Sequence, residues 1–245
     1  MRIARALALA GIDSRRKCEV HVTNGAVTVN GEVIRDLAMQ VDPEKDAILF
    51  RGRPLCFHKP IYYILNKPEG YTTTVGDPHA RKTVYELLPR HLISGSRQPR
   101  LSHTRVFAVG RLDRDSMGLL LFTNDGELAH RLMHPRYEVG KWYEVKLSRA
   151  FESKDRIRLA EGVRLSDGTA KPEKVHQISA RVVRLLLREG KKREVRRLFE
   201  RLNYKVLKLC RTSLGPISLG PLPLGRGRFL TSTEVGALRR LAFKN

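Results

Sequence analysis

The chain has 245 residues, of which 47 are Lys or Arg and 25 are Asp or Glu, so its formal net charge is +22. This excess of positive charge favours RNA or DNA as a partner over a membrane surface, and 41% hydrophobic residues exclude a disordered basic tail. No run of residues is long enough to span a bilayer, and the N-terminus lacks the apolar core of a signal peptide. We therefore expect a folded, cytoplasmic protein that binds nucleic acid and no membrane.

The cysteines point to no disulfide and no metal. Cys18, Cys56 and Cys210 are odd in number and widely spaced, so they form neither a disulfide framework nor a zinc-binding pattern. We expect them to be reduced structural thiols of a cytosolic protein.

The first 59 residues predict a small domain that begins with two helices. The second helix spans residues 15–23, with Ser14 as its N-cap. Arg15, Arg16 and Lys17 occupy its first turn, which is the unfavourable end of a helix for cations. A partner that supplies negative charge would explain this placement, so we predict that these three residues bind RNA.

A hairpin and a linker follow. Asn30-Gly31 is a strong two-residue hairpin signal after the alternating segment 27–29. Residues 51–60 carry two prolines and three cations and are typical of a linker. The sequence thus predicts a small helix-helix-hairpin domain with a basic surface at residues 1–59 and a second domain at residues 60–245.

The second domain opens with a strand at residues 62–65 and a turn at residues 66–70. A short helix is predicted at residues 83–88. The Ser-, Arg- and Pro-rich stretch 91–104 is expected to be a mobile loop near the RNA.

The most informative stretch surrounds an aspartate. The apolar run 119–122, bounded by turn residues, predicts a strand buried on both faces, and a helix is expected at residues 127–133. Asp113 lies just ahead of this strand between Arg111 and Arg114, which would keep its carboxylate ionised. It is a candidate nucleophile, although by residue type alone an inert surface pair with Arg111 is the more common arrangement.

The remainder of the chain adds a strand, a basic segment and two helices. Residues 141–147 alternate with period two and place Tyr143 at the head of an apolar face. Residues 148–180 are polar and rich in turns, and they predict no clear element. Between residues 181 and 211 there are 12 Lys or Arg against 3 Glu, a net charge of +9. Thr231 and Glu234 form a capping box for a last helix.

The basic segment predicts a strand at residues 182–187 and a helix at residues 194–202. The phase of that helix places Arg196 at the edge of its apolar stripe, whereas Arg193 and Arg197 point away from it. We expect Arg196 to reach inward and the outward cations to meet phosphate; these are Lys191, Lys192, Arg193 and Arg197.

Three separated motifs resemble those of the pseudouridine synthases that act on bacterial ribosomal RNA. They are Gly110-Arg111-Leu112-Asp113 with Thr123-Asn124-Asp125-Gly126, then Lys141-Trp142-Tyr143-Glu144-Val145, and Gly190-Lys191-Lys192-Arg193-Glu194-Val195-Arg196-Arg197. Residues 2–31 resemble the RNA-binding domain first named for a small-subunit ribosomal protein. Glu194 and Asn203 stand where the family usually has glutamine and glycine; Asn203 still suits a left-handed C-cap.

The resemblance implies both fold and chemistry. It implies an α+β catalytic domain on a mixed, largely antiparallel sheet, which converts a uridine of rRNA to pseudouridine without a cofactor. Asp113 would be the nucleophile, Tyr143 would stack on the target uracil, and Arg196 would pair with Asp113. Arg111 would fill the space left by the flipped base. The motif at residues 123–135 is most similar to members that modify large-subunit rRNA or its precursor particle, acting as monomers.

Two other classes of protein remain possible from the residues alone. A catalytically silent RNA-binding or ribosome-assembly protein would be equally basic, but it would not need the set Asp113, Tyr143 and Arg196. An RNA methyltransferase would also be basic, but the sequence shows no glycine-rich loop after a strand for a nucleotide-like methyl donor.

Overall fold

A computed structural model describes residues 1–74, 81–93 and 106–244 of the chain. These residues form two compact units. The first contains Met1–Ile61, Asn124–Gly126 and the described parts of Pro89–Phe107; the second contains the rest. The predicted loop at residues 91–104 lies almost entirely outside the described residues. Within the described chain, no helix is long and apolar enough to cross a membrane.

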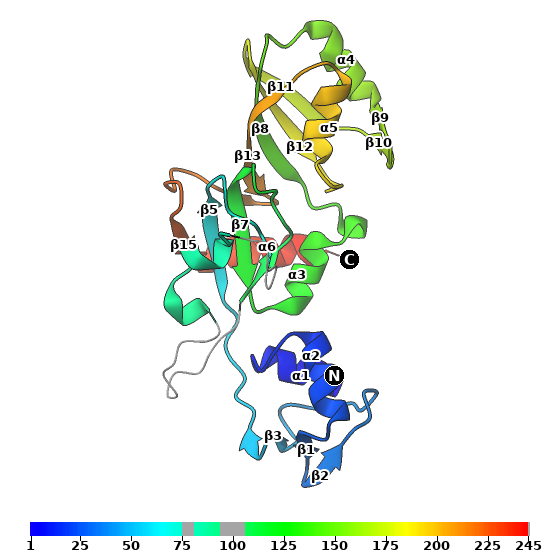
Figure 1. Ribbon diagram of the computed structural model, residues 1–245, viewed down its shortest axis with the longest axis vertical. Helices are drawn as coiled ribbons and strands as arrows, with labels where there is room; N and C mark the ends of the chain where they lie inside the picture. Colours follow the sequence, from blue (N-terminus) through cyan, green and yellow to red (C-terminus); the bar gives the residue numbers. More distant parts are fainter. Residues whose placement is uncertain (75–80, 94–105, 245) are drawn as a thin grey trace. The chain divides into compact units, whose positions relative to one another are not determined.

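The first unit packs two helices beside a small antiparallel sheet of strand order β2-β1-β3-β4 (Figure 1). Its elements are α1 (Ile3–Leu9), α2 (Arg15–Thr23), β1 (Val27–Val29), β2 (Glu32–Ile34), β3 (Ile48–Phe50) and β4 (Arg53–Pro54). Ser14 caps α2 as predicted, since its side chain accepts a hydrogen bond from the Lys17 amide. Asn30 and Gly31 take positive φ in the predicted hairpin turn.

The predicted linker is partly wrong. Arg51 and Gly52 take positive φ and turn the chain back, so that Arg53 pairs with Phe50 and extends the sheet by one strand. The two residues supply a hairpin turn without an Asn-Gly signal, so the composition of this stretch gave no warning of it.

The second unit is built on a nine-stranded sheet of order β11-β12-β8-β13-β7-β5-β15, to which β6 and β14 add at the side. The strands of this sheet are β5 (Tyr62–Lys67), β6 (Phe107–Val109), β7 (Met117–Thr123), β8 (Lys141–Leu147), β11 (Lys174–Ser179), β12 (Val182–Leu187), β13 (Val206–Leu214), β14 (Ile217–Ser218) and β15 (Gly227–Phe229). A separate two-stranded sheet contains β9 (Val163–Leu165) and β10 (Gly168–Ala170). β13 and β7 run parallel, whereas the other neighbours in this strand order, and β14 with β13, pair antiparallel, which confirms the predicted mixed sheet.

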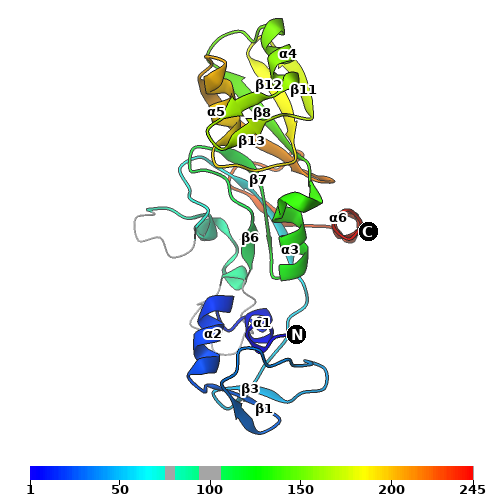
Figure 2. The ribbon, with the colours of Figure 1, turned by 90° about the vertical axis from the view of Figure 1, so that its right-hand side faces the viewer.

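Helices cover the sheet where the strands are apolar. They are α3 (Gly126–Met133), α4 (Ser153–Glu161), α5 (Glu194–Arg201) and α6 (Ser232–Ala242), with 3-10 turns at Val84–Leu87 and Pro135–Tyr137; a third 3-10 turn, Arg90–Leu92, belongs to the first unit. α4 and α5 lie on one face of β8 and β12 and share a buried core with them (Figures 1 and 2). The helix α4 and the strands β9 to β11 arise from residues 148–180, where the sequence had predicted no element.

One glycine decides how the centre of the sheet closes. Gly118 takes a φ of +104°, and a Cβ atom built there would lie 2.3 Å from the carbonyl oxygen of Arg211. Gly118 and Arg211 are partners in the parallel pairing of β7 with β13. A side chain at residue 118 would therefore push the two strands apart.

Candidate active site

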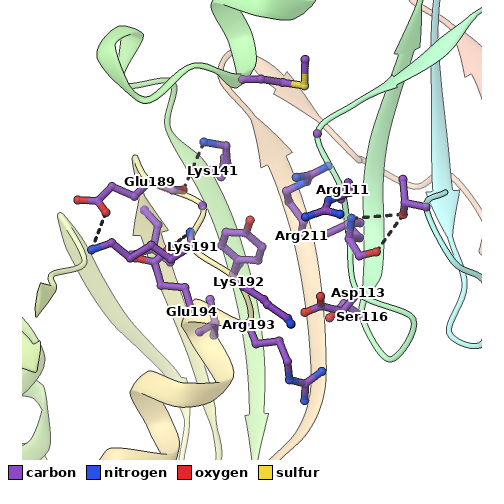
Figure 3. Close-up of a pocket in the computed structure, with 18 of the residues that line it drawn as sticks. Arg111, Asp113, Ser116, Lys141, Glu189, Lys191, Lys192, Arg193, Glu194 and Arg211 are labelled. Carbon is purple, nitrogen blue, oxygen red and sulfur yellow. Dashed lines mark hydrogen bonds and ion pairs between the residues drawn. The ribbon is translucent and has the colours of Figure 1, made fainter. Parts of the chain in front are cut away.

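A pocket of roughly 880 Å³ opens in the second unit, between the loop that precedes β7 and the segment that precedes α5 (Figure 3). The predicted site residues among those that line it are Arg111, Asp113, Tyr143, Lys191, Lys192 and Arg193. Arg196 and Arg197 are not among its lining residues, and Arg15, Arg16 and Lys17 belong to the first unit. The structure thus gathers three separated motifs around one cavity.

The loop that carries Asp113 is fixed by its main chain. The Thr73 hydroxyl donates to the Leu112 carbonyl at 2.9 Å, and the Ser116 amide donates to the Asp113 carbonyl at 3.0 Å. Within the described chain, no hydrogen bond or ion pair engages the Asp113 carboxylate, and the residue is half-buried. A held backbone with an unengaged carboxylate is the arrangement that a nucleophile requires.

Lys67 supports the same loop from beneath. Its side chain is fully buried at the end of β5, and Nζ donates to the carbonyls of Ser116 at 2.6 Å, Asp113 at 3.0 Å and Pro68 at 3.1 Å. Burial lowers the pKa of Lys67 to about 8, while the charges of Asp115 and Asp113 oppose this shift. The ammonium group therefore remains mostly protonated at neutral pH. The sequence prediction ended the strand at residue 65 and placed Lys67 in the following turn, whereas β5 continues through Lys67 and buries it.

Tyr143 lies on β8 as predicted, on the face that it shares with Val145 and Leu147. Its neighbours across the sheet are Leu185 on β12 and Arg211 on β13. The ring is half-buried against the core and also lines the pocket, so it can present a face to a ligand.

Arg196 reaches inward as its helical phase predicts, with only 13% of its side chain exposed, but its partner differs from the expected one. Nε lies 3.0 Å from a carboxylate oxygen of Asp115, and Nη2 donates to the Asp115 carbonyl. Nη1 donates to the Val206 carbonyl at 3.1 Å. The predicted pairing with Asp113 is therefore wrong for this structure, because the turn at residues 113–116 directs Asp115 toward α5.

The other basic residues divide into engaged and exposed ones. Arg193 forms three hydrogen bonds to Asp115, one at 3.1 Å and two at 3.3 Å, and Arg197 forms two to Asp167, at 2.7 and 2.9 Å. Partial burial disfavours the Asp115 anion, yet Arg193 and Arg196 hold the pKa of its carboxyl below the ordinary value. Lys191 pairs with Glu189, whereas Arg111 and Lys192 are exposed at the pocket.

The predicted cations of α2 are exposed in the first unit. Arg15 and Lys17 form long ion pairs with Glu19 and Asp13, at 4.0 and 3.7 Å, and Arg16 is exposed as well. Such weak surface pairs can exchange their partner for a phosphate at small cost.

The charged lining residues that sequence reasoning missed include three that are buried or half-buried: Lys141, Glu194 and Arg211. Burial raises the pKa of Glu194, whose carboxylate accepts from the Lys191 amide at 3.1 Å. No sequence signal marks these residues, because their burial results from strands that are distant along the chain. In the described chain, no group of three His, Cys, Asp or Glu side chains could hold a metal ion.

Comparisons with known proteins agree with this geometry. The family model described as RNA pseudouridylate synthase matches residues 61–201, and the S4 domain model matches residues 1–48. The chain belongs to the RNA pseudouridylate synthase family. The family match contains the Asp113 loop, Tyr143 and the segment that enters α5, and of the residues that line the pocket only Leu209, Arg211 and Leu214 lie outside it.

Similar proteins match this chain over nearly all of its length. An uncharacterized RNA pseudouridine synthase of Aquifex aeolicus is 39% identical over 97% of this chain and 93% of its own. The ribosomal large subunit pseudouridine synthase B of Bacillus subtilis is 37% identical over 98% and 96%. A crystal structure of a pseudouridylate synthase covers 97% of this chain and 99% of its own, with a TM-score of 0.67 and 28% identity.

Proposed function

We propose that this enzyme isomerises a uridine of large-subunit ribosomal RNA, or of its precursor particle, and that Asp113 is the nucleophile. One observation supports this proposal most directly. The Asp113 carboxylate lines a pocket and has no protein partner in the described chain, while Lys67 and Thr73 hold the main chain of its loop by hydrogen bonds. The ribosomal substrate rests on the name of the Bacillus subtilis relative. An rRNA target implies action in the cytoplasm, and we propose a monomer.

The chemistry needs an accessible base. A uracil within a helix cannot reach the pocket, so the target nucleotide is flipped out or already unpaired. Tyr143 then stacks on the uracil, and the exposed Arg111 fills the vacated stack. Asp113 attacks either carbon 6 of the base or carbon 1′ of the sugar, the uracil is detached and turned, and it rejoins the ribose through carbon 5.

The charge distribution supports a role in holding RNA. The exposed Lys192 at the pocket and the exposed Arg15, Arg16 and Lys17 of the first unit are placed to meet phosphates, which supply most of the affinity in such complexes. Arg193 and Arg197 are held by carboxylates, so a phosphate must displace Asp115 or Asp167 before they can contact RNA.

The test is a pseudouridine map of ribosomal RNA with and without the protein, followed by assay of Asp113→Asn. We expect Asp113→Asn to abolish turnover and to leave the fold and the RNA affinity nearly unchanged, because the side chain keeps its size. Asp115→Asn is the matched control on the same loop, and it should keep measurable turnover. Measurable turnover by Asp113→Asn would contradict the assignment. It would do so most clearly if Asp115→Asn were inactive while Asp113→Asn was active.

A further inference from the structure

Arg211 is a buried cation with an unused donor in the pocket wall. Only 2% of the residue is exposed, and its Nε donates to the Leu119 carbonyl at 2.7 Å. Its Nη2 atom is also buried and has no hydrogen-bond partner among the described residues. A buried guanidinium donor without an acceptor is costly, so a ligand is expected to supply the acceptor.

The surroundings of Arg211 offer no compensating charge. No carboxylate forms an ion pair with it in the part of the chain that the structure describes. Lys141, another lining residue, has its pKa lowered to about 8 by burial and, in addition, by the positive charge of Arg211. The carboxylate that acts on Lys141 is Glu194, which accepts from the Lys191 amide. The two cations Lys141 and Arg211 therefore outnumber Glu194 in this wall of the pocket, and Arg211 keeps a buried donor without an acceptor among the described residues.

The position of Arg211 determines which part of the substrate this side chain can contact. Arg211 is the cross-strand partner of Tyr143, and side chains in such pairs stand about 5 Å apart on one face of the sheet. A uracil stacked on Tyr143 therefore places its edge within reach of the guanidinium. The backbone phosphates of the RNA are strongly hydrated, and the exposed Arg111 and Lys192 can meet them at the pocket mouth.

We propose that Arg211 donates from Nη2 to a carbonyl oxygen of the target uracil and stabilises the negative charge on the detached base. This inference rests on the proposed function. When the bond between C1′ and N1 breaks, its electron pair stays with the base and spreads over the two carbonyl oxygens. An electron pair of the detached base then forms the bond from C5 to C1′. The C5 proton leaves and N1 gains a proton, while Arg211 keeps its own protons throughout. A fixed donor in a dry site is well suited to such a charge.

The experiment compares two RNA fragments that carry either uridine or 5-fluorouridine at the mapped target position. Fluorine at C5 withdraws electrons and stabilises the detached anion by itself, so the protein's donor matters less. Single-turnover cleavage of the C1′–N1 bond is measured at saturating protein for wild type, Arg211→Gln, Arg211→Lys and the control Arg184→Gln. Arg184 stacks over Trp142, and its strand partner is Glu144.

We expect Arg211→Gln to slow cleavage of the uridine RNA by about 100-fold, which is typical of losing one donor to a developing anion. The same substitution should slow cleavage of the 5-fluorouridine RNA by only about tenfold, because the fluorine leaves less charge for Arg211 to stabilise. Arg211→Lys should recover part of the rate, and Arg184→Gln should match wild type. The RNA dissociation constant and its salt dependence should not change in any variant.

Other outcomes overturn the inference. Equal losses on the two RNAs would mean that Arg211 acts on the fold or on Asp113 rather than on the base. A weaker affinity with a salt slope lower by about one, at an unchanged rate, would mean a phosphate contact. If Arg211→Gln does not fold, Arg211→Lys takes its place. A folded Arg211→Lys whose cleavage rates on the uridine and 5-fluorouridine RNAs keep the wild-type ratio would also overturn the inference. Failure of the wild-type protein to form pseudouridine would instead refute the proposed function.

Discussion

Two carboxylates on one short loop have opposite surroundings. Asp115 is bound by Arg193 and Arg196, whereas the Asp113 carboxylate has no partner in the described chain. An ion pair occupies the lone pairs that a nucleophile needs, which is why we propose Asp113, and not Asp115, as the nucleophile. Asp115 is better placed to hold the two arginines against the loop. The order of the residues along the chain cannot show this division, because both aspartates have arginine neighbours in sequence.

At the residue scale, Arg196 and Arg197 should differ in what they control. Arg196→Met removes the bonds to Asp115 and Val206 behind the pocket, and we expect its single-turnover rate to fall by about tenfold to 100-fold at unchanged affinity. Arg197→Met loses the pair with Asp167 and the bond to Ser166, both away from the pocket lining, so it should weaken RNA binding slightly and spare the rate. Its salt slope should fall by less than one unit, because a phosphate must compete with Asp167.

The measurement is single-turnover kinetics of both variants over a salt series at saturating protein. If Arg197→Met loses the rate while Arg196→Met loses only affinity, then the helical phase assigned to α5 does not describe their roles.

At the scale of elements, the centre of the sheet depends on the close approach of β7 and β13. Gly118 allows this approach, and both strands help to position the pocket. The loop that carries Asp113 leads directly into β7, and Arg211 lies on β13. A change that separates these strands therefore affects stability and chemistry together.

Gly118→Ala tests this dependence. The added Cβ would lie 2.3 Å from the Arg211 carbonyl oxygen, and the positive φ of +104° is unfavourable for alanine. We expect a loss of about 3 kcal/mol or more in the free energy of unfolding, measured by denaturant titration. Gly31→Ala is the control for positive φ in open space, since nothing lies within 4 Å of a Cβ there. A loss no greater than that of Gly31→Ala would contradict the packing argument.

The capping box of α6 predicts a dependence of stability on pH. Glu234 is hydrogen-bonded to Arg228 at 2.7 Å and to the Thr231 amide at 2.8 Å. Arg228 is the main cause that lowers the pKa of Glu234 to about 2, from an ordinary value of 4.5. Because the folded pKa is depressed, this stabilisation is complete above pH 4.5 and is lost as pH falls toward 2.

The check is the melting temperature of wild type and Glu234→Gln between pH 6 and pH 2. The wild type should be the more stable protein at the upper end, and the difference should shrink across the window from about 4.5 to about 2. A difference that is constant over this range would contradict the role given to the Glu234 charge.

The elements that the sequence predicts are those with a local signal. The cap at Ser14 gives α2, the continuous apolar run gives β7, and the capping box gives α6. The residues that it missed have partners far along the chain. Lys67 contacts carbonyls at residues 113–116, and Arg211 contacts Leu119, so their burial follows from strand order. Strand order depends on pairings that no single stretch of sequence determines.

At the scale of the whole molecule, the formal charge of +22 is shared by two units that match different families. The first unit has its own apolar core, which includes Ile3, Leu7 and Val22, and the second has a separate core around α5. Separate cores allow each unit to fold alone. The predicted boundary at residue 59 remains a prediction.

We expect a shortened chain, residues 60–245, to fold and to retain the chemistry but to bind RNA less tightly. Its affinity should fall less steeply with salt than that of the full chain, because fewer phosphates are contacted. The measurement is the RNA dissociation constant of both proteins over a salt series, with the single-turnover rate as the control. Equal salt slopes would argue against an RNA-binding role for the first unit.

Lys67 also bears on how such an enzyme can change its target. The ammonium group contacts carbonyl oxygens of the loop at residues 113–116, which are the same whatever side chains the loop carries. The shape of the loop is therefore largely independent of the side chain at residue 114, which is exposed. Mutation there can alter what the rim presents to RNA while Asp113 keeps its position. Substrate preference can thus diverge during evolution without rebuilding the catalytic apparatus.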